Sequence, residues 1–195
     1  FGGTVAFSFV SLAVQHFFAH GGEAAVVVRV ANRATRATLD IPAGREVLRL
    51  QARQPGSREH LRVSVDYDRV ERTLDKFNLV IERVSRAGSQ LVDDQEVFDG
   101  LSMDPTDERF IVDALQDSEL VRLVGPLPSH RPTATVAASP GQPIPYITVK
   151  QAGSDGEELT DYDVIGSNSQ GTGLVARDAL PRPDLVSVPS PPGPD

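Results

Sequence analysis

Apolar residues recur at helical spacing near the start of the chain. A helix over residues 7–19 gathers one apolar face, made of Phe7, Val10, Val14, Phe17 and Phe18. Two glycines follow, and either can take the left-handed conformation that ends a helix at low steric cost. The pattern predicts a helix that stops at a glycine corner.

A β-branched run comes directly after this corner. Residues 26–30 hold four valines around Arg29, a composition typical of a strand buried on both faces. We expect Arg29 to project from this strand. The corner between helix and strand would be set by Phe17, Phe18, Gly21 and Gly22.

Alternating apolar and polar positions predict further strands after a polar link. The link contains Asn32 and Thr35, and turns are expected at Pro55-Gly56 and Asp99-Gly100. The predicted strands are residues 45–52, 61–67, 76–84, 90–99 and 120–125.

A second helix is expected between the last two of these strands. Asp104 or Thr106 can cap it, with Pro105 in its first turn. Its apolar positions are Phe110, Ile111, Ala114 and Leu115. We expect Phe98, Leu101 and Phe110 to anchor this helix.

Composition changes after residue 125. Residues 126–145 contain six prolines among Ser, Thr and Ala, which is typical of an extended linker or long loop. A short strand at 145–150, a loop leading to a short helix, and a strand at 184–189 follow, before a proline-rich tail. The sequence therefore predicts an α+β domain at 1–125, a linker at 126–145, and the start of an incomplete domain at 146–195.

The charge pattern argues against nucleic acid as a partner. The net charge is −8 over 195 residues, and the basic residues are scattered, with Lys76 and Lys150 the only lysines. Nucleic-acid binding usually shows a basic stripe or patch. Cysteine is absent, and no apolar run approaches the roughly 20 residues of a membrane span. We expect neither nucleic acid nor membrane as a partner.

Two motifs suggest ligand sites, but each lacks residues that the site requires. The loop 166–173, GSNSQGTG, resembles a phosphate loop, yet Thr172 stands where the P-loop has lysine. The stretch 66–75 spaces acids as a calcium loop does, but Glu71 and Phe77 occupy the positions of its glycine and glutamate. A plain turn and a solvated hairpin connection are the preferred interpretations.

The titratable residues give no catalytic pattern. His16 and His20 are one helical turn apart, without a third ligand, and the acidic run Asp93, Asp94 and Glu96 is typical of a solvated strand edge. No serine lies in a G-x-S-x-G elbow. We therefore expect no enzyme activity, no cofactor and no metal.

The order of the segments resembles the sheath proteins of contractile phage tails and related injection machines. An FGG lead, a helix, FFAHGG and AVVVRV resemble that family's aromatic pair, glycines and strand ending in Val-Arg-Val. LRLQARQPGSREHLRVSVD, FNLVI, EVFDGLSMDP and SELVRL follow in the family's order, and GTGLVARDAL with DLVSVP resembles the start of its assembly domain. PGSREH departs from the family's usual Pro-Gly-x-Trp-Gly-Asn turn, and GLVAR from its Gly-Leu-Tyr-Ala-Leu.

This resemblance implies a structural protein and a fragment of a longer subunit. Sheath subunits stack in helical rings around an inner tube, attach to a baseplate, and contract to drive the tube through a target envelope. They assemble in the cytoplasm and then form the sheath of the phage tail or particle, and they lend terminal strands to neighbouring subunits. The resemblance does not distinguish a phage from a tailocin or another injection particle.

Two other classes of function stay open at this point. A β-rich extracellular binding module would use the proline-rich segments as stalks. A hydrolase with dispersed active-site residues is the other alternative.

Overall fold

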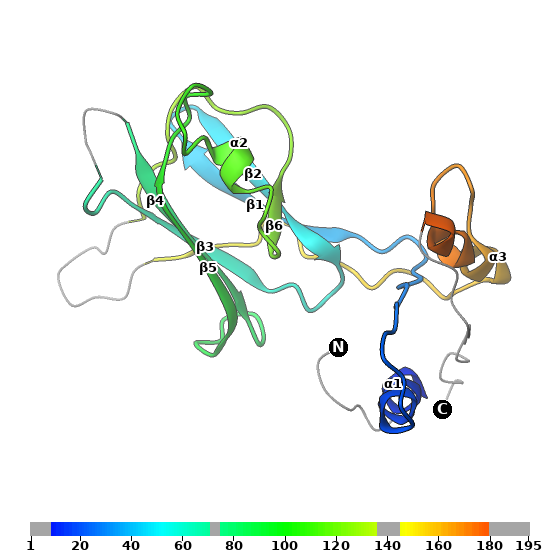
Figure 1. Cartoon of the computed structure of the whole chain (residues 1–195). Helices are drawn as coiled ribbons and strands as arrows, with labels where there is room; N and C mark the ends of the chain where they lie inside the picture. The colour runs from blue at the N-terminus through cyan, green and yellow to red at the C-terminus, as the bar shows by residue number, and fades with distance from the viewer. Residues whose placement is uncertain (1–8, 71–74, 136–144, 180–195) are drawn as a thin grey trace. The chain divides into compact units, whose positions relative to one another are not determined.

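The computed structural model describes residues 9–70, 75–135 and 145–179, and it is an α+β structure (Figure 1). The chain divides into two units. Unit 1 comprises Phe1–Val30 and Leu159–Asp195, and unit 2 comprises Ala31–Glu158. Unit 2 is therefore inserted in sequence between the two segments of unit 1.

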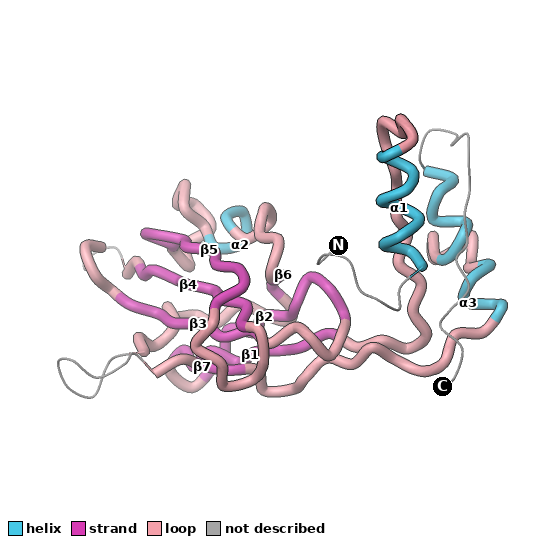
Figure 2. The backbone as a smooth tube through the Cα atoms, turned by 90° about the horizontal axis from the view of Figure 1, so that it is seen from below, coloured by secondary structure: helices cyan, strands magenta, loops and turns pink. Residues whose placement is uncertain are grey.

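Unit 2 is built of two antiparallel sheets (Figure 2). The order in the first sheet is β1-β2-β6, and in the second it is β5-β4-β3-β7. The strands are β1 (Arg36–Ala43), β2 (Glu46–Pro55), β3 (Leu61–Asp66), β4 (Phe77–Val84), β5 (Val92–Leu101), β6 (Val121–Leu123) and β7 (Ile147–Thr148).

The two sheets enclose one hydrophobic core. Leu39 and Leu50 of the first sheet and Val63, Leu79 and Ile81 of the second are among its fully buried side chains. The chain after β7 joins the sheets, because β7 pairs with β3 while Lys150 N donates to Thr38 O of β1 at 2.7 Å. Burying each such aliphatic side chain stabilises the fold by about 1.5–3 kcal/mol.

The segment between β5 and β6 joins the other edges of the two sheets, so that the sheets close into a barrel. This segment contains the single-turn helix α2 (Ile111–Ala114) and returns along β5. The Glu96 carboxylate of β5 accepts hydrogen bonds from Ser118 Oγ at 2.6 Å, Glu119 N at 2.7 Å and Leu120 N at 3.2 Å. Glu96 therefore fastens β5 to the chain that enters β6.

The two ends of unit 2 pair with each other, and we call this pairing the neck (residues 32–35 with 154–158). Glu157 N donates to Asn32 O at 2.8 Å, and Arg33 forms an ion pair with Glu157 at 3.0 Å. Thr35 and Ser154 exchange backbone hydrogen bonds at 3.1 and 3.0 Å. The chain thus enters and leaves unit 2 at adjacent points.

The observed division differs from the predicted domains. Residues 126–135 form the expected loop, but they are held to unit 2 rather than linking two domains. Thr133 N donates to Pro42 O at 2.7 Å, Thr135 N donates to Val65 O at 2.8 Å, and the Arg131 guanidinium stacks on the Tyr67 ring at 3.8 Å. The boundaries fall at 30/31 and 158/159 because these contacts and β7 belong to unit 2.

The second predicted helix is much shorter than expected. Asp104 does not cap a helix; its carboxylate accepts hydrogen bonds from the backbone and hydroxyl of Thr106, which lowers the pKa of Asp104. The resulting turn delays helical structure until Ile111. The local polar contacts therefore compete successfully with the helix.

The predicted turn at Asp99-Gly100 is a bulge within a strand. β5 continues through Gly100 to Leu101, with a shift in register opposite Phe77 and Leu79. Gly100 has φ +64°, and its N–H donates to Asn78 Oδ1 at 2.9 Å. The side-chain acceptor replaces a ladder partner, so the strand is not interrupted.

The described part of unit 1 contains three helical elements. They are α1 (Phe9–Ala19), α3 (Asp161–Ile165) and the 3-10 helix η2 (Gly173–Ala179). α3 begins at a capping box in which the Asp163 carboxylate accepts from Thr160 N at 2.8 Å. The predicted strand at 184–189 and the proline-rich tail lie outside the described residues.

Candidate functional site

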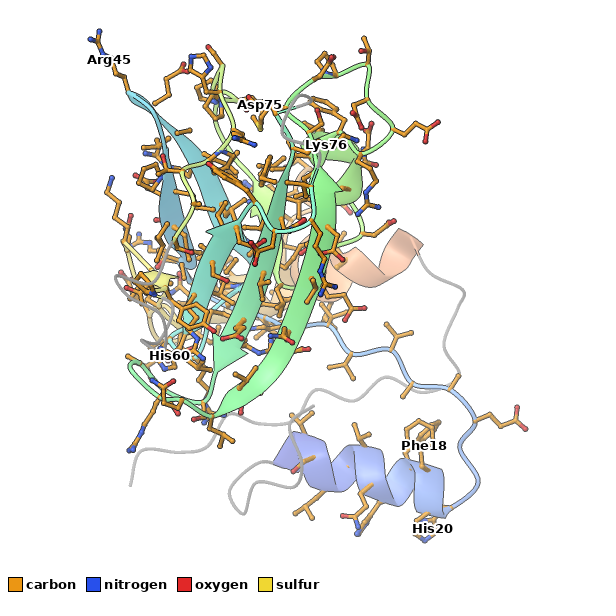
Figure 3. All side chains as sticks on the ribbon, turned by 90° about the vertical axis from the view of Figure 1, so that its left-hand side faces the viewer. Phe18, His20, Arg45, His60, Asp75 and Lys76 are labelled. Carbon is orange, nitrogen blue, oxygen red and sulfur yellow. The ribbon has the colours of Figure 1, made fainter. Side chains whose placement is uncertain are left out.

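The glycine corner at the end of α1 forms as its sequence predicts. Gly22 N donates to Phe17 O at 2.9 Å, and Gly21 has φ +91°. A Cβ atom at Gly22 would lie 2.2 Å from the Phe17 ring, so a larger residue there would displace this ring from its observed position. Phe17 packs edge-on against Phe18 with ring centroids 5.2 Å apart, and Figure 3 shows Phe18 and His20 at this end of the helix.

The predicted strand after the corner is wrong for this chain. Residues 22–31 have no strand structure, and Val26, Val27 and Val28 are 68%, 42% and 38% exposed. Arg29 lies in this segment with an exposed side chain rather than on a strand. A strand needs a neighbour for its backbone N–H and C=O groups, and the described residues pair none with this segment.

Unit 1 exposes apolar side chains that have the composition of a core. Among residues 10–30 and 159–176, no apolar side chain is buried. The exposed ones include Val10, Leu12, Phe18, Leu159, Tyr162, Ile165 and Leu174, in addition to the three valines. We call this set the apolar surface of unit 1. Large contiguous exposed apolar patches are typical of sites of association.

Phe98, Leu101 and Phe110 meet in the core of unit 2, at α2. Leu101 is fully buried, and Phe98 and Phe110 pack against the same core cluster. Ile111 N donates to Ser102 O at 3.0 Å, which brings the start of α2 beside the end of β5. All three residues therefore belong to, or pack against, the core cluster that also contains Ile111 of α2, and this helix has one turn.

The acidic run on β5 is only partly a solvated edge. Asp93 is exposed and Asp94 forms an ion pair with Arg83 at 3.0 Å, whereas Glu96 closes the barrel. Sequence reasoning missed the role of Glu96, because the donors come from residues 22–24 positions further along the chain.

A buried polar network lies between β3, β4 and β5. Arg62 and Glu82 form an ion pair at 2.6 Å with both side chains nearly inaccessible, and Gln95 Nε2 donates to the other Glu82 oxygen at 2.8 Å. Arg62 also donates to Ser89 O at 3.1 Å, and its guanidinium stacks on Tyr146 at 4.0 Å. Every charge in the network has a partner, so its role is structural.

Asp40 is a second carboxylate held by two cations. Arg49 Nε donates to it at 2.7 Å and Lys150 Nζ at 2.5 Å. The hydrogen bonds from Arg49 and then Lys150 lower the pKa of Asp40 to about 2. Lys150 thereby ties the chain after β7 to the outside of β1.

The ligand motifs considered from the sequence have other structural uses. In the loop 166–173 a Cβ atom at Gly166 would lie 1.8 Å from Thr172 O, so these glycines serve a tight turn. Asp66 accepts from Asn78 Nδ2 at 2.6 Å, within the stretch that was compared with a calcium loop. His20 Nδ1 is 2.8 Å from His16 O, at the end of α1.

The described residues contain neither a metal-binding cluster nor a membrane-spanning helix. They contain no cluster of three or more His, Asp or Glu side chains arranged to hold a metal ion. None of their helices has the length and apolar character needed to cross a bilayer.

Comparison with known proteins identifies no family. No protein-family model matches the chain, and no curated protein sequence matches it. The function must therefore be argued from the residues of the chain itself.

Proposed function

We propose that this chain is part of a contractile tail sheath subunit, a structural protein that polymerises around an inner tube. Its partners would be other sheath subunits, the tube protein and the baseplate, and its place the sheath of a phage tail or related particle. Contraction would release energy stored in a metastable packing of subunits, so the subunit needs no catalytic residues.

The apolar surface of unit 1 is the observation that carries this proposal. Unit 2 has a complete core, whereas the described part of unit 1 buries no apolar side chain. The exposed Val26–Val28 segment has strand composition and no partner strand within the described residues. These two features are typical of a lattice subunit, because neighbouring chains cover its exposed apolar side chains and pair with its unpaired strand segments.

The order of the sequence motifs also supports a sheath. Six segments follow one another as they do in that family, from the aromatic pair to the Thr-Gly-Leu turn. Unit 2 is inserted in sequence between the two segments of unit 1. This arrangement is consistent with unit 1 forming the lattice and unit 2 being an additional module carried by it.

To test this proposal, the whole protein encoded by the gene would be expressed both unmodified and with the substitution Val27→Lys, and each form examined for assembly. We expect hollow tubes in negative-stain microscopy, and we expect the charged residue to abolish them by preventing burial of Val27. Leu127→Lys is the matched control, since Leu127 is similarly exposed but lies in unit 2. A monomeric product, even with its tube partner present, would refute the sheath proposal.

A β-rich binding module is the second candidate. The closed core of unit 2 and its paired ends favour it, because they describe a self-contained module. Neighbouring genes for tube and baseplate proteins would argue for the sheath, and a secretion signal encoded in the same gene would argue for the binding module.

A further inference from the structure

The charge of the chain is concentrated in one stretch of unit 2. Residues 91–120 contain ten carboxylates and one arginine, a net charge of −9. The rest of the chain, with 17 carboxylates and 18 basic residues, has a net charge of +1. The overall charge of −8 therefore belongs almost entirely to β5, α2 and the loops between β5 and β6.

The fold gathers these carboxylates on one side of unit 2, which we call the acidic surface (exposed acids of residues 91–119). Arg109 donates to Asp99 O at 2.9 Å, and Ser118 donates to Glu96, so the turn 102–110, α2 and β5 lie together. Arg83 and Lys76 pair with Asp94 and Asp107, which leaves ten carboxylates against three bases. Val97, 54% exposed, lies on the outward side of β5 within this surface.

The outward side of the β1-β2-β6 sheet has the opposite sign, and we call it the basic face (Arg36, Arg49, Arg53 and Arg122). The alternating burial of β1 and β2 directs these side chains away from the core. Asp40 lies on the same outward side of β1 as Arg36, and its carboxylate forms an ion pair with Lys150. Arg45 extends the face at the tip of the β1–β2 hairpin, where Figure 3 shows it pointing away from the strands.

Asp40 is paired with Arg49 and Lys150, but this single carboxylate leaves the basic face with a net positive charge, as the acidic surface keeps an excess of carboxylates. Arg122 bonds to the neutral Gln51, and Arg53 donates to the carbonyl oxygens of Gln116 and Ser118. The basic face also carries an exposed valine, Val47, as the acidic surface carries Val97. The two surfaces therefore match in charge and each has an apolar contact to bury.

We propose that the occupant of the acidic surface is a second copy of this chain, docked through its basic face. Because the two surfaces are different, each copy in such a pair leaves one of them available, and the contact extends to further copies. A contact of this kind builds rings or helical filaments. The inference rests on the proposed function in one respect, that the partner is another subunit; it assigns a lattice contact to unit 2 rather than to unit 1.

Two charge-reversing substitutions in each surface of the full chain test this contact. The acidic-surface variant carries Asp93→Lys and Asp117→Lys, and the basic-face variant carries Arg45→Glu and Arg122→Glu. A control with Glu23→Lys and Asp68→Lys has the same change in net charge as the acidic-surface variant, outside both surfaces. Equal thermal unfolding midpoints would establish that all variants are folded.

Self-association is measured by sedimentation velocity over a range of salt concentration. We expect each surface variant to weaken association by more than about tenfold, and the control to leave it unchanged. Association of the unmodified chain should weaken between about 0.1 M and about 1 M NaCl, as the screening length falls from about 10 Å to about 3 Å. An equimolar mixture of the two surface variants should associate again at least as pairs, because the unmodified basic face of one variant can bind the unmodified acidic surface of the other.

Three results would overturn the inference. They are a chain that is monomeric at every salt concentration, association that survives both reversals, and a mixture that fails to restore it. Val27→Lys separates this inference from the sheath proposal. If Val27→Lys abolishes assembly while both charge variants assemble normally, the contact through unit 2 is refuted and the sheath proposal stands.

Discussion

Asp40 couples the stability of unit 2 to pH. Its folded-state pKa of about 2 lies below the ordinary value of 3.8 for an aspartate, because Arg49 and Lys150 donate to it. A carboxylate with a lowered pKa stabilises the fold above its unfolded pKa and loses that contribution as the pH falls toward its folded pKa. The contribution is therefore complete above about pH 5 and is lost by about pH 2.

Asp40→Asn should lower the free energy of unfolding by on the order of 1 kcal/mol at neutral pH, a figure reduced for screening at the surface. Urea unfolding at a series of pH values measures this, and the difference from the unmodified chain should vanish near pH 2. Asp93→Asn is the control, since that carboxylate is exposed. A difference that did not change with pH would contradict the argument.

Glu96→Ala should destabilise unit 2 by about 2 kcal/mol, because it leaves the buried Ser118 hydroxyl and two backbone N–H groups without their acceptor. Glu96→Gln keeps one carbonyl oxygen and should cost about half as much. Denaturant midpoints of both variants give the comparison. Equal midpoints for Glu96→Ala and Asp93→Ala would show that Glu96 does not fasten the barrel.

At the scale of elements, an alternating pattern of apolar and polar residues predicts a strand correctly where that segment also pairs with a neighbouring strand. β2, β3, β4 and β6 lie where the alternating patterns place them. No strand was predicted at β1, although Ala37, Leu39, Ile41 and Ala43 alternate with more polar residues and are fully buried. Residues 26–30 show the opposite error: strong strand composition, but no partner strand among the described residues.

The features of the candidate site that could be predicted from the sequence are those that depend on contacts between residues close together in the chain. The corner at Phe17 and Gly22 depends on contacts five residues apart, so the sequence shows it directly. The roles of Glu96 and the basic face depend on which strands become neighbours, and no local pattern contains that information. The bulge of β5 at Gly100 depends on the Asn78 side chain of the neighbouring strand, so the sequence indicates a turn there instead.

The neck depends on Gly156, and Gly156→Ala should open it. Gly156 has φ +94°, and a Cβ atom there would lie 2.0 Å from Asn32 O and 2.8 Å from Ala34 N. Hydrogen exchange of the Thr35, Ser154 and Glu157 amides, which donate in the neck, reports the opening. We expect protection of these three amides to be lost.

Gly88→Ala is the matched control for this substitution. Gly88 has φ +76° but nothing within 4 Å of the added Cβ atom. It should cost only the backbone strain of about 1–2 kcal/mol and leave exchange in the neck unchanged. If the two variants behaved alike, close approach of the backbone would not explain Gly156.

At the scale of the whole molecule, stability resides in unit 2. Apart from Pro128 and Pro132, which also belong to unit 2, all apolar side chains that are buried among the described residues lie between Ala37 and Val121. The excised segment 31–158 should therefore fold alone and unfold cooperatively, with a urea midpoint close to that of the full chain. A peptide of residues 9–30 should be largely unfolded in water, since an isolated helix as short as α1 is marginal. Failure of 31–158 to fold would show that unit 1 contributes to the core.

The paired ends of unit 2 also determine how the chain carries mechanical load. Tension between residues 30 and 159 enters and leaves the inserted unit at one place, so it acts first on the Asn32–Glu157 and Arg33–Glu157 contacts. The hydrogen bonds of an antiparallel pair lie across the strands, and force at one end breaks them one after another. The neck would therefore yield at low force and lengthen the connection between the two segments of unit 1, while the barrel remains unloaded until the neck has opened.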